Sequence, residues 1–479
     1  MKNQVLLLLD VFVPTIGSLF LPLIGLVSLR ARNALAFCMV AVSLVCSLAL
    51  IPAVLPGGGG VTVALPLNFR FQADGLAVFV AIVSSLVSSV ILLYSTAYIR
   101  HYEHQNEYYL MVVLFLGSMM GLVFAGNLIL LYVFWELTAI ASWRLIGFFR
   151  EKLHVIRADK AFLVTVFGAL SMLLAFVSIY VQTGSFDLLK IKEALKGAPL
   201  PGLTVALIML GILSKSATLP FHTWLPDAGV APSPVTALLH AAVLVKIGVY
   251  VFARLFIVTF AVSDACQTTI LVVAAASALV SAGAAMIETD LKRIIAYSTV
   301  SQIAFIFLGL AAGRNELAIA GGLLYILMHG LAKGGLFLCA GIVEQKTHTK
   351  DITQMGGLIK TMPITAVSFL FCAFSVMGLP PFGGFFSKYM VISGAVQAGH
   401  PWVAAVFVIG AFLTILYLMR LFNAVFLGRP QLEPVNEGSP VMVACVALLA
   451  VLSLAAGLVI NPPFHLAQTA VQQMLGLIR

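Results

Sequence analysis

An all-α membrane protein with about 14 transmembrane helices is the fold that the sequence predicts, and three observations predict it. Of the 479 residues, 61% are hydrophobic and only 9% are charged, whereas soluble domains carry roughly 25% charged residues. The mean hydropathy of the chain is +1.09. Apolar runs follow one another along the whole sequence, without a polar stretch long enough to fold as a soluble domain. We therefore expect a single integral membrane domain over residues 1–479.

Each expected span is a run of about 20 mainly apolar residues, the length that crosses the hydrocarbon core as a helix. The weakest boundary separates the fourth and fifth spans, where Gly126 and Asn127 are the only break. The fourteen spans are expected at residues 4–29, 33–55, 74–98, 108–126, 127–149, 160–182, 202–219, 234–258, 266–288, 293–313, 317–343, 362–397, 401–427 and 440–461.

Two of these segments carry residues that interrupt a helix. The run 202–219 continues into a stretch with Pro220 and Pro226, and 362–397 is too long for one straight span and contains Gly-Leu-Pro-Pro at 378–381. Proline removes a backbone donor and breaks helices. Irregular backbone at membrane depth is tolerated only against protein or a water-filled cavity. We therefore expect spans 7 and 12 to be broken helices.

Paired interruptions in corresponding parts of two halves indicate a transporter built from inverted repeats. Spans 4–8 and spans 9–13 would be the two repeats, with five helices each. The expected division of the chain is spans 1–3 in residues 1–107, the first repeat in 108–258, the second repeat in 266–427, and the last span and tail in 440–479.

The distribution of Lys and Arg predicts the orientation, because cytoplasmic loops carry the basic excess. Loops after the odd-numbered spans hold thirteen of these residues and the other side holds seven. We therefore expect both termini outside, with residues 187–197 as the main exception. Arg144, Arg254 and Arg420 lie towards span ends, and we expect their charges to extend to the membrane surface. The net charge of +9 reflects basic loops and not binding of nucleic acid.

Ionisable side chains in the middle of apolar runs carry the functional signal. The seven residues of this kind are Glu136 on span 5, Lys215 on span 7, His240 and Lys246 on span 8, His329 and Lys333 on span 11, and Lys388 on span 12. A charge at bilayer depth is costly and is kept where it is paired, hydrated or functional. So many of them predict a path for protons or cations, and static packing of paired charges is the alternative.

The spacing of these residues suggests how they would work together. Lys215 has no acid in its own run, so Glu136 is its natural partner, and opening or closing the pair would move a proton. His329 and Lys333 are four residues apart and share one helix face. His240 and Lys246 are separated by about 600° of helix rotation and need not touch. His240 is as well suited to cap the preceding loop as to carry a proton.

Motifs for other chemistry are missing from the sequence. It contains no Walker motif, dinucleotide fingerprint or cluster of metal-ligand spacing. The six cysteines show no CxxC spacing, which argues against iron–sulfur, zinc or haem attachment. We expect no catalytic, cofactor-binding or metal-binding residue, so that an ion gradient or a partner protein must supply the energy.

Five motifs occur together and in order: WEL at 135–137 followed by LIGFF at 145–149, SKSATLPFHTWLPDAGVAPSPVTALLHA at 214–241, LKRIIAYSTVSQI at 291–303, LMHGLAKGGLFLCAG at 327–341 and GLPPFGGFFSKYM at 378–390. With them the chain resembles the antiporter-like proton-translocating subunits of respiratory complex I, of membrane-bound hydrogenase and formate hydrogenlyase complexes, and of multisubunit Na⁺/H⁺ antiporters. The resemblance covers roughly residues 70–430.

The resemblance implies a fourteen-helix subunit with two inverted five-helix repeats and broken helices 7 and 12. It implies an ion path that starts at the glutamate and lysine matched by Glu136 and Lys215. It also implies central groups matched by Lys246, His329 and Lys333, with His240 as a variant, and a terminal lysine matched by Lys388. Other membrane subunits are the implied partners, and a prokaryotic inner membrane is the implied location.

The reading that we favour is a proton-translocating subunit of a redox-driven complex of the NADH:quinone oxidoreductase or membrane hydrogenase type, with peripheral redox subunits as partners. Three alternatives stay open. They are a subunit of a multisubunit Na⁺/H⁺ antiporter, an energy-coupling membrane subunit of an inorganic-carbon uptake complex, and a scaffold with static charges. Protons are the expected cargo, and Na⁺ is the open alternative.

Overall fold

Long apolar helices make up nearly the whole molecule. The computed structural model describes residues 1–429 and 435–477, so that the end of the expected tail lies outside the described residues. In this part of the chain twelve helices are long and apolar enough to cross a membrane, and two shorter apolar helices accompany them. The predicted all-α polytopic fold is confirmed. The count of about 14 spans, the domain boundaries and the orientation of the termini stay predictions.

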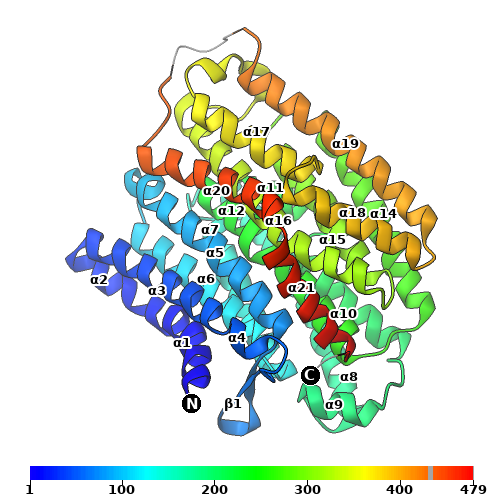
Figure 1. Ribbon diagram of the computed structural model, residues 1–479. Coiled ribbons are helices and arrows are strands. Elements are labelled where there is room, and N and C mark those ends of the chain that lie inside the picture. The colour runs from blue at the N-terminus through cyan, green and yellow to red at the C-terminus, as the bar shows by residue number, and fades with distance from the viewer. Residues whose placement is uncertain (430–434, 478–479) are drawn as a thin grey trace.

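The N-terminal spans form one side of the molecule (Figure 1). Spans 1 and 2 are each divided, and the hydroxyl of Ser28 caps the second by accepting a hydrogen bond from the amide of Ala31 at 3.2 Å. A short antiparallel hairpin pairs Val61 with Ala73 before span 3. The elements are α1 (Lys2–Gly17), η1 (Ser18–Phe20), α2 (Leu21–Val27), α3 (Leu29–Ala49), α4 (Ile51–Val54), β1 (Val61–Ala64), η2 (Pro66–Asn68), β2 (Arg70–Ala73), α5 (Gly75–Tyr98) and η3 (Ile99–His101).

The middle of the chain holds the first expected repeat. Asn127 separates the fourth and fifth spans, because its side-chain oxygen accepts a hydrogen bond from the amide of Ile129 at 2.8 Å and starts a new helix. The elements are α6 (Gln105–Val123), α7 (Leu128–Ile146), α8 (Lys152–Thr183), α9 (Leu188–Leu195), α10 (Gly202–Lys215), α11 (Trp224–Asp227), η4 (Ala228–Val230), α12 (Ser233–Ala237), η5 (Leu238–Ala242), α13 (Leu244–Phe252) and η6 (Ala253–Thr259).

Of the remaining helices, α14, α18 and α19 form the opposite side of the molecule in Figure 1, whereas α20 and α21 cross its centre, and α21 packs against α5 and α16. The elements are α14 (Asp264–Ile287), α15 (Leu291–Ala311), α16 (Glu316–Thr347), η7 (Ile352–Gln354), η8 (Leu358–Lys360), α17 (Pro363–Met377), α18 (Gly383–Gln397), α19 (Pro401–Phe426), α20 (Pro440–Leu458) and α21 (Asn461–Leu475).

Both expected interruptions are present. α10 ends at Lys215, and irregular backbone leads to α11; the indole of Trp224 donates a hydrogen bond to the free carbonyl of Ser214 at 2.9 Å. α17 ends before Gly378, which has a φ of 82°, a backbone conformation that favours glycine. α18 then begins at Gly383. The prolines and glycines therefore break spans 7 and 12 where the sequence predicts it.

Span 8 holds a third irregularity that the sequence did not reveal. Its residues 238–242 (η5) and 253–259 (η6) are π-helical, and α13 lies between them. π-helical turns are rare and occur frequently at functional sites. η5 contains His240, so this irregularity places the histidine at a point where backbone carbonyls lack their usual helical partners.

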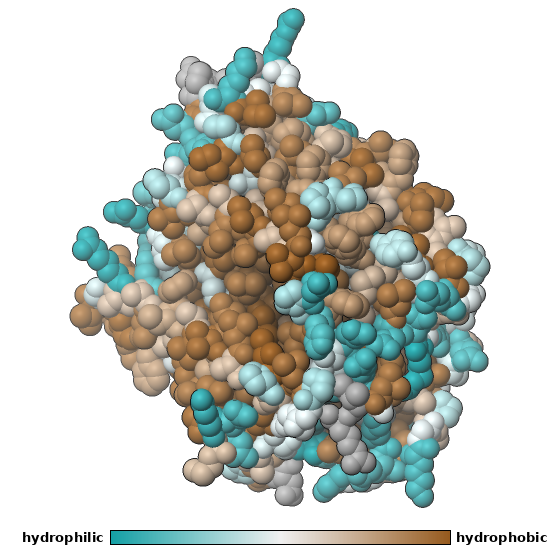
Figure 2. All heavy atoms as spheres, viewed as in Figure 1, coloured by the Kyte–Doolittle hydropathy of each residue, from teal (hydrophilic) through white to brown (hydrophobic). Residues whose placement is uncertain are grey.

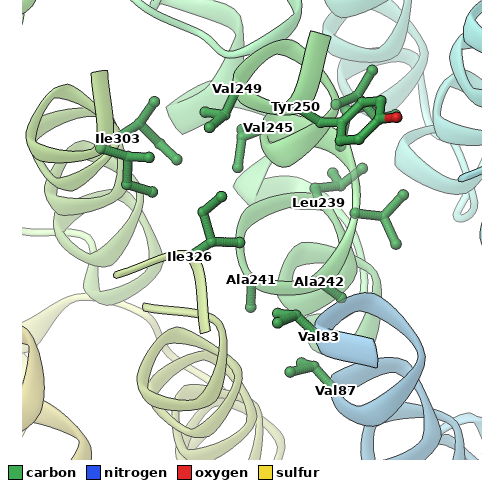
Figure 3. Packing of buried hydrophobic residues seen from close by; sticks show 14 of the residues in the cluster. Val83, Val87, Leu239, Ala241, Ala242, Val245, Val249, Tyr250, Ile303 and Ile326 are labelled. Carbon is green, nitrogen blue, oxygen red and sulfur yellow. The ribbon is translucent and has the colours of Figure 1, made fainter. Parts of the chain in front are cut away.

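The core is one continuous cluster of buried apolar side chains between the helices. Figure 3 shows Val83 and Val87 of α5 packed beneath Ala241 and Ala242 of η5. A side chain added at Gly334 of α16 would contact Val87 at 3.3 Å, so that α5, η5 and α16 meet closely at the centre. Figure 2 shows an apolar surface over the centre and left of this face, with hydrophilic residues at its upper end and in a patch that extends from the centre to the lower right.

Two groups of basic residues near the span ends form ion pairs within the protein. Arg254 is 5% exposed and donates to both carboxylate oxygens of Asp74, so the expectation that its charge extends to the surface is wrong. Asp227 accepts hydrogen bonds at 2.7 Å from both Lys160 and Arg293. Partial burial would raise the pKa of Asp227, but these two hydrogen bonds outweigh it and hold the pKa below its ordinary value of 3.8.

Candidate functional site

Lys215 occupies the last residue of α10, and its side chain turns towards α7. It is fully buried, donates a hydrogen bond to the carbonyl oxygen of Trp135 at 3.2 Å and lies 5.3 Å from the centre of the Trp135 ring. Glu136 follows Trp135 directly and is half-buried. The charged groups of Glu136 and Lys215 are not within the 4.0 Å of an ion pair. The expected pair is therefore adjacent but open.

Lys246 and His329 are in direct contact. Lys246 extends from α13 and is 1% exposed, and its Nζ lies 3.1 Å from Nδ1 of His329 on α16. Lys246 also donates a hydrogen bond to the carbonyl of Ala241 within the π-helical η5. The irregular turn thus supplies an acceptor that a regular helix would have used internally.

Lys333 lies one helical turn beyond His329 and turns to a different neighbour. Its Nζ donates to the carbonyl of Ile295 at 3.1 Å and to the hydroxyl of Ser298, both on α15. His329 and Lys333 therefore share one face of α16, as the spacing predicts, but each has its own partner on an adjacent helix.

Lys388 is buried within α18 and is only 4% exposed. Its Nζ donates to the carbonyl of Val376 at 2.7 Å, near the free end of α17, and lies 4.4 Å from the centre of the Phe305 ring and 5.6 Å from that of Tyr325. The hydroxyl of Tyr325 in turn donates to the side chain of Gln302. The second broken helix thus places Lys388 in the interior of the protein.

His240 is fully buried but has a different environment. Its ring lies against the ring of Phe337, with 4.3 Å between the ring centres. Neither ring nitrogen has a hydrogen-bond partner among the described residues. A buried polar group normally has such a partner, often an ordered water molecule. His240 therefore does not cap the preceding loop.

We call the set of buried residues Lys215, Lys246, His329, Lys333 and Lys388 the polar axis; within it Lys246 and His329 are in direct contact. Its four lysines share one feature, because each donates a hydrogen bond to a backbone carbonyl. Ion pairs within 4.0 Å link none of these lysines to a carboxylate among the described residues. A carbonyl oxygen accepts a hydrogen bond from an ammonium or from a neutral amine, so each site can hold lysine in both protonation states.

Neutral side chains that the sequence analysis did not assign to the site complete the axis. Gln302 donates to the hydroxyl of Thr414 at 3.2 Å, so α15 links α16 to α19. Ser84 and Ser88 on α5 have buried hydroxyls without a partner among the described residues. The sequence signal for Gln302 is its place in the polar stretch 297–302 of span 10, and the two serines lie in a stretch where small polar residues are expected to pack helices together.

Comparisons with known proteins agree with this arrangement of helices. Residues 125–414 match the family described as NADH:quinone oxidoreductase/Mrp antiporter, and residues 61–109 match the N-terminus of chain 5 of NADH-ubiquinone oxidoreductase (complex I). The Na⁺/H⁺ antiporter subunit A1 of Staphylococcus haemolyticus is 35% identical over 422 residues, which are 82% of this chain and 52% of the relative. A corresponding Na⁺/H⁺ antiporter subunit of Alkalihalophilus pseudofirmus is 36% identical over 421 residues, 81% of this chain and 51% of the relative. The chain spans about half the length of these curated relatives.

Three solved structures share the fold. A chain of the Mrp complex from Dietzia sp. superposes with a TM-score of 0.89 and 24% identity, over 99% of this chain and 98% of that chain. A chain of the archaeal membrane-bound sulfane sulfur reductase gives 0.90 and 23%, over 98% of each. A chain of respiratory complex I from Thermus thermophilus gives 0.85 and 24%, over 98% of this chain and all of that chain.

Proposed function

The chain belongs to the NADH:quinone oxidoreductase/Mrp antiporter family of membrane subunits, and on that premise we propose that it translocates protons along the polar axis. Glu136 and Lys215 form the first part of the path, Lys246, His329 and Lys333 the middle, and Lys388 the far end. The chain contributes this step to a larger complex that supplies the driving force.

The single observation that carries the proposal is the solvation of the buried lysines by carbonyl oxygens. An ammonium group removed from water costs several kcal/mol unless charge compensates it. Lys246, Lys333 and Lys388 each donate a hydrogen bond to a backbone carbonyl but have no carboxylate within ion-pair distance among the described residues. The carbonyl dipoles therefore offset only part of the cost of burying the positive charge. A lysine whose charged and neutral forms are close in free energy gains and loses a proton readily, whereas a lysine paired with a carboxylate would stay charged.

Each step of the path follows a contact. Lys246 and His329 can exchange a proton directly across the 3.1 Å between Nζ and Nδ1. Lys333 lies one turn further along α16, and Ser298 and Gln302 lie one turn apart on α15. Tyr325 connects Gln302 to the region of Lys388. Water at the unpartnered nitrogen of His329 would bridge the steps that side chains do not span.

The first step runs from α10 to α13, where the two helices are in close contact. A side chain at Gly248 would overlap Ser216, the neighbour of Lys215, at 2.9 Å. Lys246 lies two residues before this contact. Movement of Glu136 towards Lys215 would favour the ammonium, and movement away would release its proton towards Lys246. The open arrangement of Glu136 and Lys215 is the releasing state.

We propose an Na⁺/H⁺ antiporter as the complex, because relatives named for this activity are 33–36% identical to the chain. The redox-driven complex favoured from the sequence is the second candidate, supported by the matching family description. Proton movement along the polar axis is common to both. They differ in the partner that drives it, an Na⁺ gradient or peripheral redox subunits.

Everted membrane vesicles that contain the intact complex test the proposal. Acidification of the interior is followed by quenching of acridine orange, first with an Na⁺ gradient and then with an electron donor. Glu136→Gln should lower proton flux by about 100-fold, the contribution of a positioned proton-transfer group. Glu193→Gln on the exposed face of α9 is the matched control and should keep the full rate. Normal flux in an assembled Glu136→Gln complex would contradict the proposal.

The two complexes are distinguished by what purifies with the chain. Gentle purification from native membranes followed by mass spectrometry would find iron–sulfur or flavin subunits in a redox-driven complex. An antiporter would yield membrane subunits alone, and its proton flux would depend on Na⁺.

A further inference from the structure

An ion pair between a buried lysine and a partly exposed glutamate lies near the start of α15 and the end of α16, outside the polar axis. A cavity of about 270 Å³ opens there between α5, α15 and α16, with Tyr98, Tyr102, Lys292, Glu344 and Lys350 among its lining residues. Glu344 and Lys292 form an ion pair with 2.6 Å between Oε2 and Nζ. The two partners differ in exposure, because the side chain of Lys292 is 1% exposed and that of Glu344 is 23% exposed.

The pair lines this cavity and makes further hydrogen bonds to a third segment. Lys292 also donates a hydrogen bond to the carbonyl of Ala231 at 3.0 Å, and the hydroxyl of Ser233 donates to the same Glu344 oxygen at 3.1 Å. Three segments are thus tied together: the start of α15, the end of α16 and the start of α12. Glu344 is the more exposed partner, so it faces the cavity more openly than Lys292 does.

Polar groups continue from Ser233 towards the polar axis. A side chain at Gly341 would overlap both Ser233 and the hydroxyl of Tyr94, so these two hydroxyl groups lie beside the same glycine. Tyr94 donates to the carbonyl of Leu338 at 2.9 Å. The ring of the neighbouring residue Phe337 packs against the ring of His240. These contacts lead from Ser233 to the surroundings of His240, and the last of them is with the apolar ring of Phe337.

The distance from Glu344 to the level of Lys333 follows from positions along the neighbouring helices α5 and α16. Glu344 lies eleven residues beyond Lys333 on α16, which is about 16 Å of helix. Val87 lies beside Gly334, so the unpartnered hydroxyls of Ser84 and Ser88 on α5 lie near the depth of Lys333. His240 has two unpartnered ring nitrogens in η5, which packs on α5 and α16. Buried polar groups without protein partners among the described residues thus lie on α5 and η5, around the inner end of the contacts that start at Ser233.

We propose that Glu344 and Lys292 form a gate on a proton access route that runs from the cavity through Ser233 to His240. Glu344 accepts a proton that arrives from the solvent as hydronium in the cavity, leaving neutral water, because Glu344 is the more exposed partner of the pair. Neutralising its carboxylate weakens its hold on Lys292 and Ser233, and the junction of α12, α15 and α16 opens. The proton then passes along water beside Ser233 and Tyr94 to the central histidine. The inference rests on the proposed proton translocation and names the residues that admit the proton.

A chemical labelling experiment tests the gate without requiring transport. The intact complex carries Ser233→Cys, and a charged, membrane-impermeant methanethiosulfonate is added from the side that contains Lys350. Peptide mass spectrometry follows residue 233 separately from the six native cysteines. Labelling should be slow when Glu344 and Lys292 are intact and about tenfold faster with Glu344→Gln, as expected when an ion pair no longer holds the closed population.

Lys350→Gln is the matched control. Lys350 lines the same cavity and lies 3.9 Å from Glu344 but is 33% exposed, so its loss changes the local charge and leaves the buried pair intact. Labelling in this variant should stay at the wild-type rate. If Glu344→Gln leaves Lys292 too poorly compensated to fold, the double variant Lys292→Gln with Glu344→Gln removes both charges and should also label fast.

Equal labelling in the Glu344→Gln, double and Lys350→Gln variants would overturn the gate. Fast labelling when the pair is intact would overturn it too, because the pair would then not be a seal. Either result leaves proton flux through Glu136 and Lys215 unaffected as a separate measurement. Loss of the proposed function with a labelling pattern as predicted would instead show a gated water path that serves another ion.

Discussion

Replacement of Lys215 by methionine distinguishes between two roles of this lysine, transfer of a proton and stabilisation of the fold. Methionine has a similar length and no charge, so it should fill the same space beside Trp135. We expect the variant to assemble, to lose proton flux and to keep its stability. A lysine that only holds α10 against α7 would give the opposite result.

The magnitude follows from the contacts of the Lys215 ammonium. Its hydrogen bond to the carbonyl of Trp135 contributes about 1.5–3 kcal/mol, and its position over the indole ring contributes about 0.5–2 kcal/mol. Transfer of the ammonium from water into the buried site on folding costs several kcal/mol. Since no ion pair offsets this cost within the described residues, methionine should shift the free energy of unfolding by about 0–2 kcal/mol towards greater stability.

The assay measures both quantities on one preparation. Thermal unfolding of the detergent-solubilised complex reports stability, and quenching of acridine orange in vesicles reports proton flux. Lys190→Met on the exposed face of α9 is the control and should change neither. A loss of stability of about 3–5 kcal/mol, the cost of breaking a buried charged contact, would refute the argument. Wild-type proton flux in Lys215→Met would refute the assignment to the path.

Lys246→Met and His329→Gln should each lower proton flux in vesicles by about 100-fold. The double variant should have no lower flux than either single variant, because the two side chains exchange one proton. Additive losses of flux would contradict direct transfer between them. Asp227→Asn should lower the free energy of unfolding by about 1–2 kcal/mol in thermal unfolding at neutral pH. Since its folded pKa lies below 3.8, this contribution is present above that pH and is lost as the pH falls through the folded pKa, so wild type and variant should converge in acid and not in alkali. Gly384→Ala should prevent assembly because the new methyl group would overlap a carbonyl oxygen of α17, whereas Gly202→Ala, which meets nothing within 4 Å, should assemble as wild type does; assembly of both would contradict the close approach of α18.

The membrane fold and its two broken helices were predictable from local sequence. Length of apolar runs is set by bilayer thickness, and Pro220 or the Gly-Leu-Pro-Pro turn at 378–381 acts on the backbone without help from distant residues. The seven ionisable residues could be named because charge is conspicuous in apolar runs. Their order along the chain was therefore available before the structure.

The partners of those residues were not predictable, because they depend on how distant helices pack. Glu136 could be matched to Lys215, but the open separation of the pair could not be foreseen. Lys246 pairs with His329 across 83 residues, and its carbonyl partner exists because η5 is π-helical, which no local pattern announced. Arg254 was expected to extend to the membrane surface, because its partner Asp74, at the start of α5, lies 180 residues away in the sequence.

Proton flux through complexes that carry Lys388→Met tests the central claim most directly, because Lys388 lies at the opposite end of the polar axis from Lys215. The comparison uses the same vesicles, the same driving force and equal amounts of assembled complex. One continuous path predicts that Lys388→Met stops acidification as completely as Lys215→Met does. Wild-type acidification in Lys388→Met beside a blocked Lys215→Met would contradict the account, since protons would then leave the chain before reaching α18.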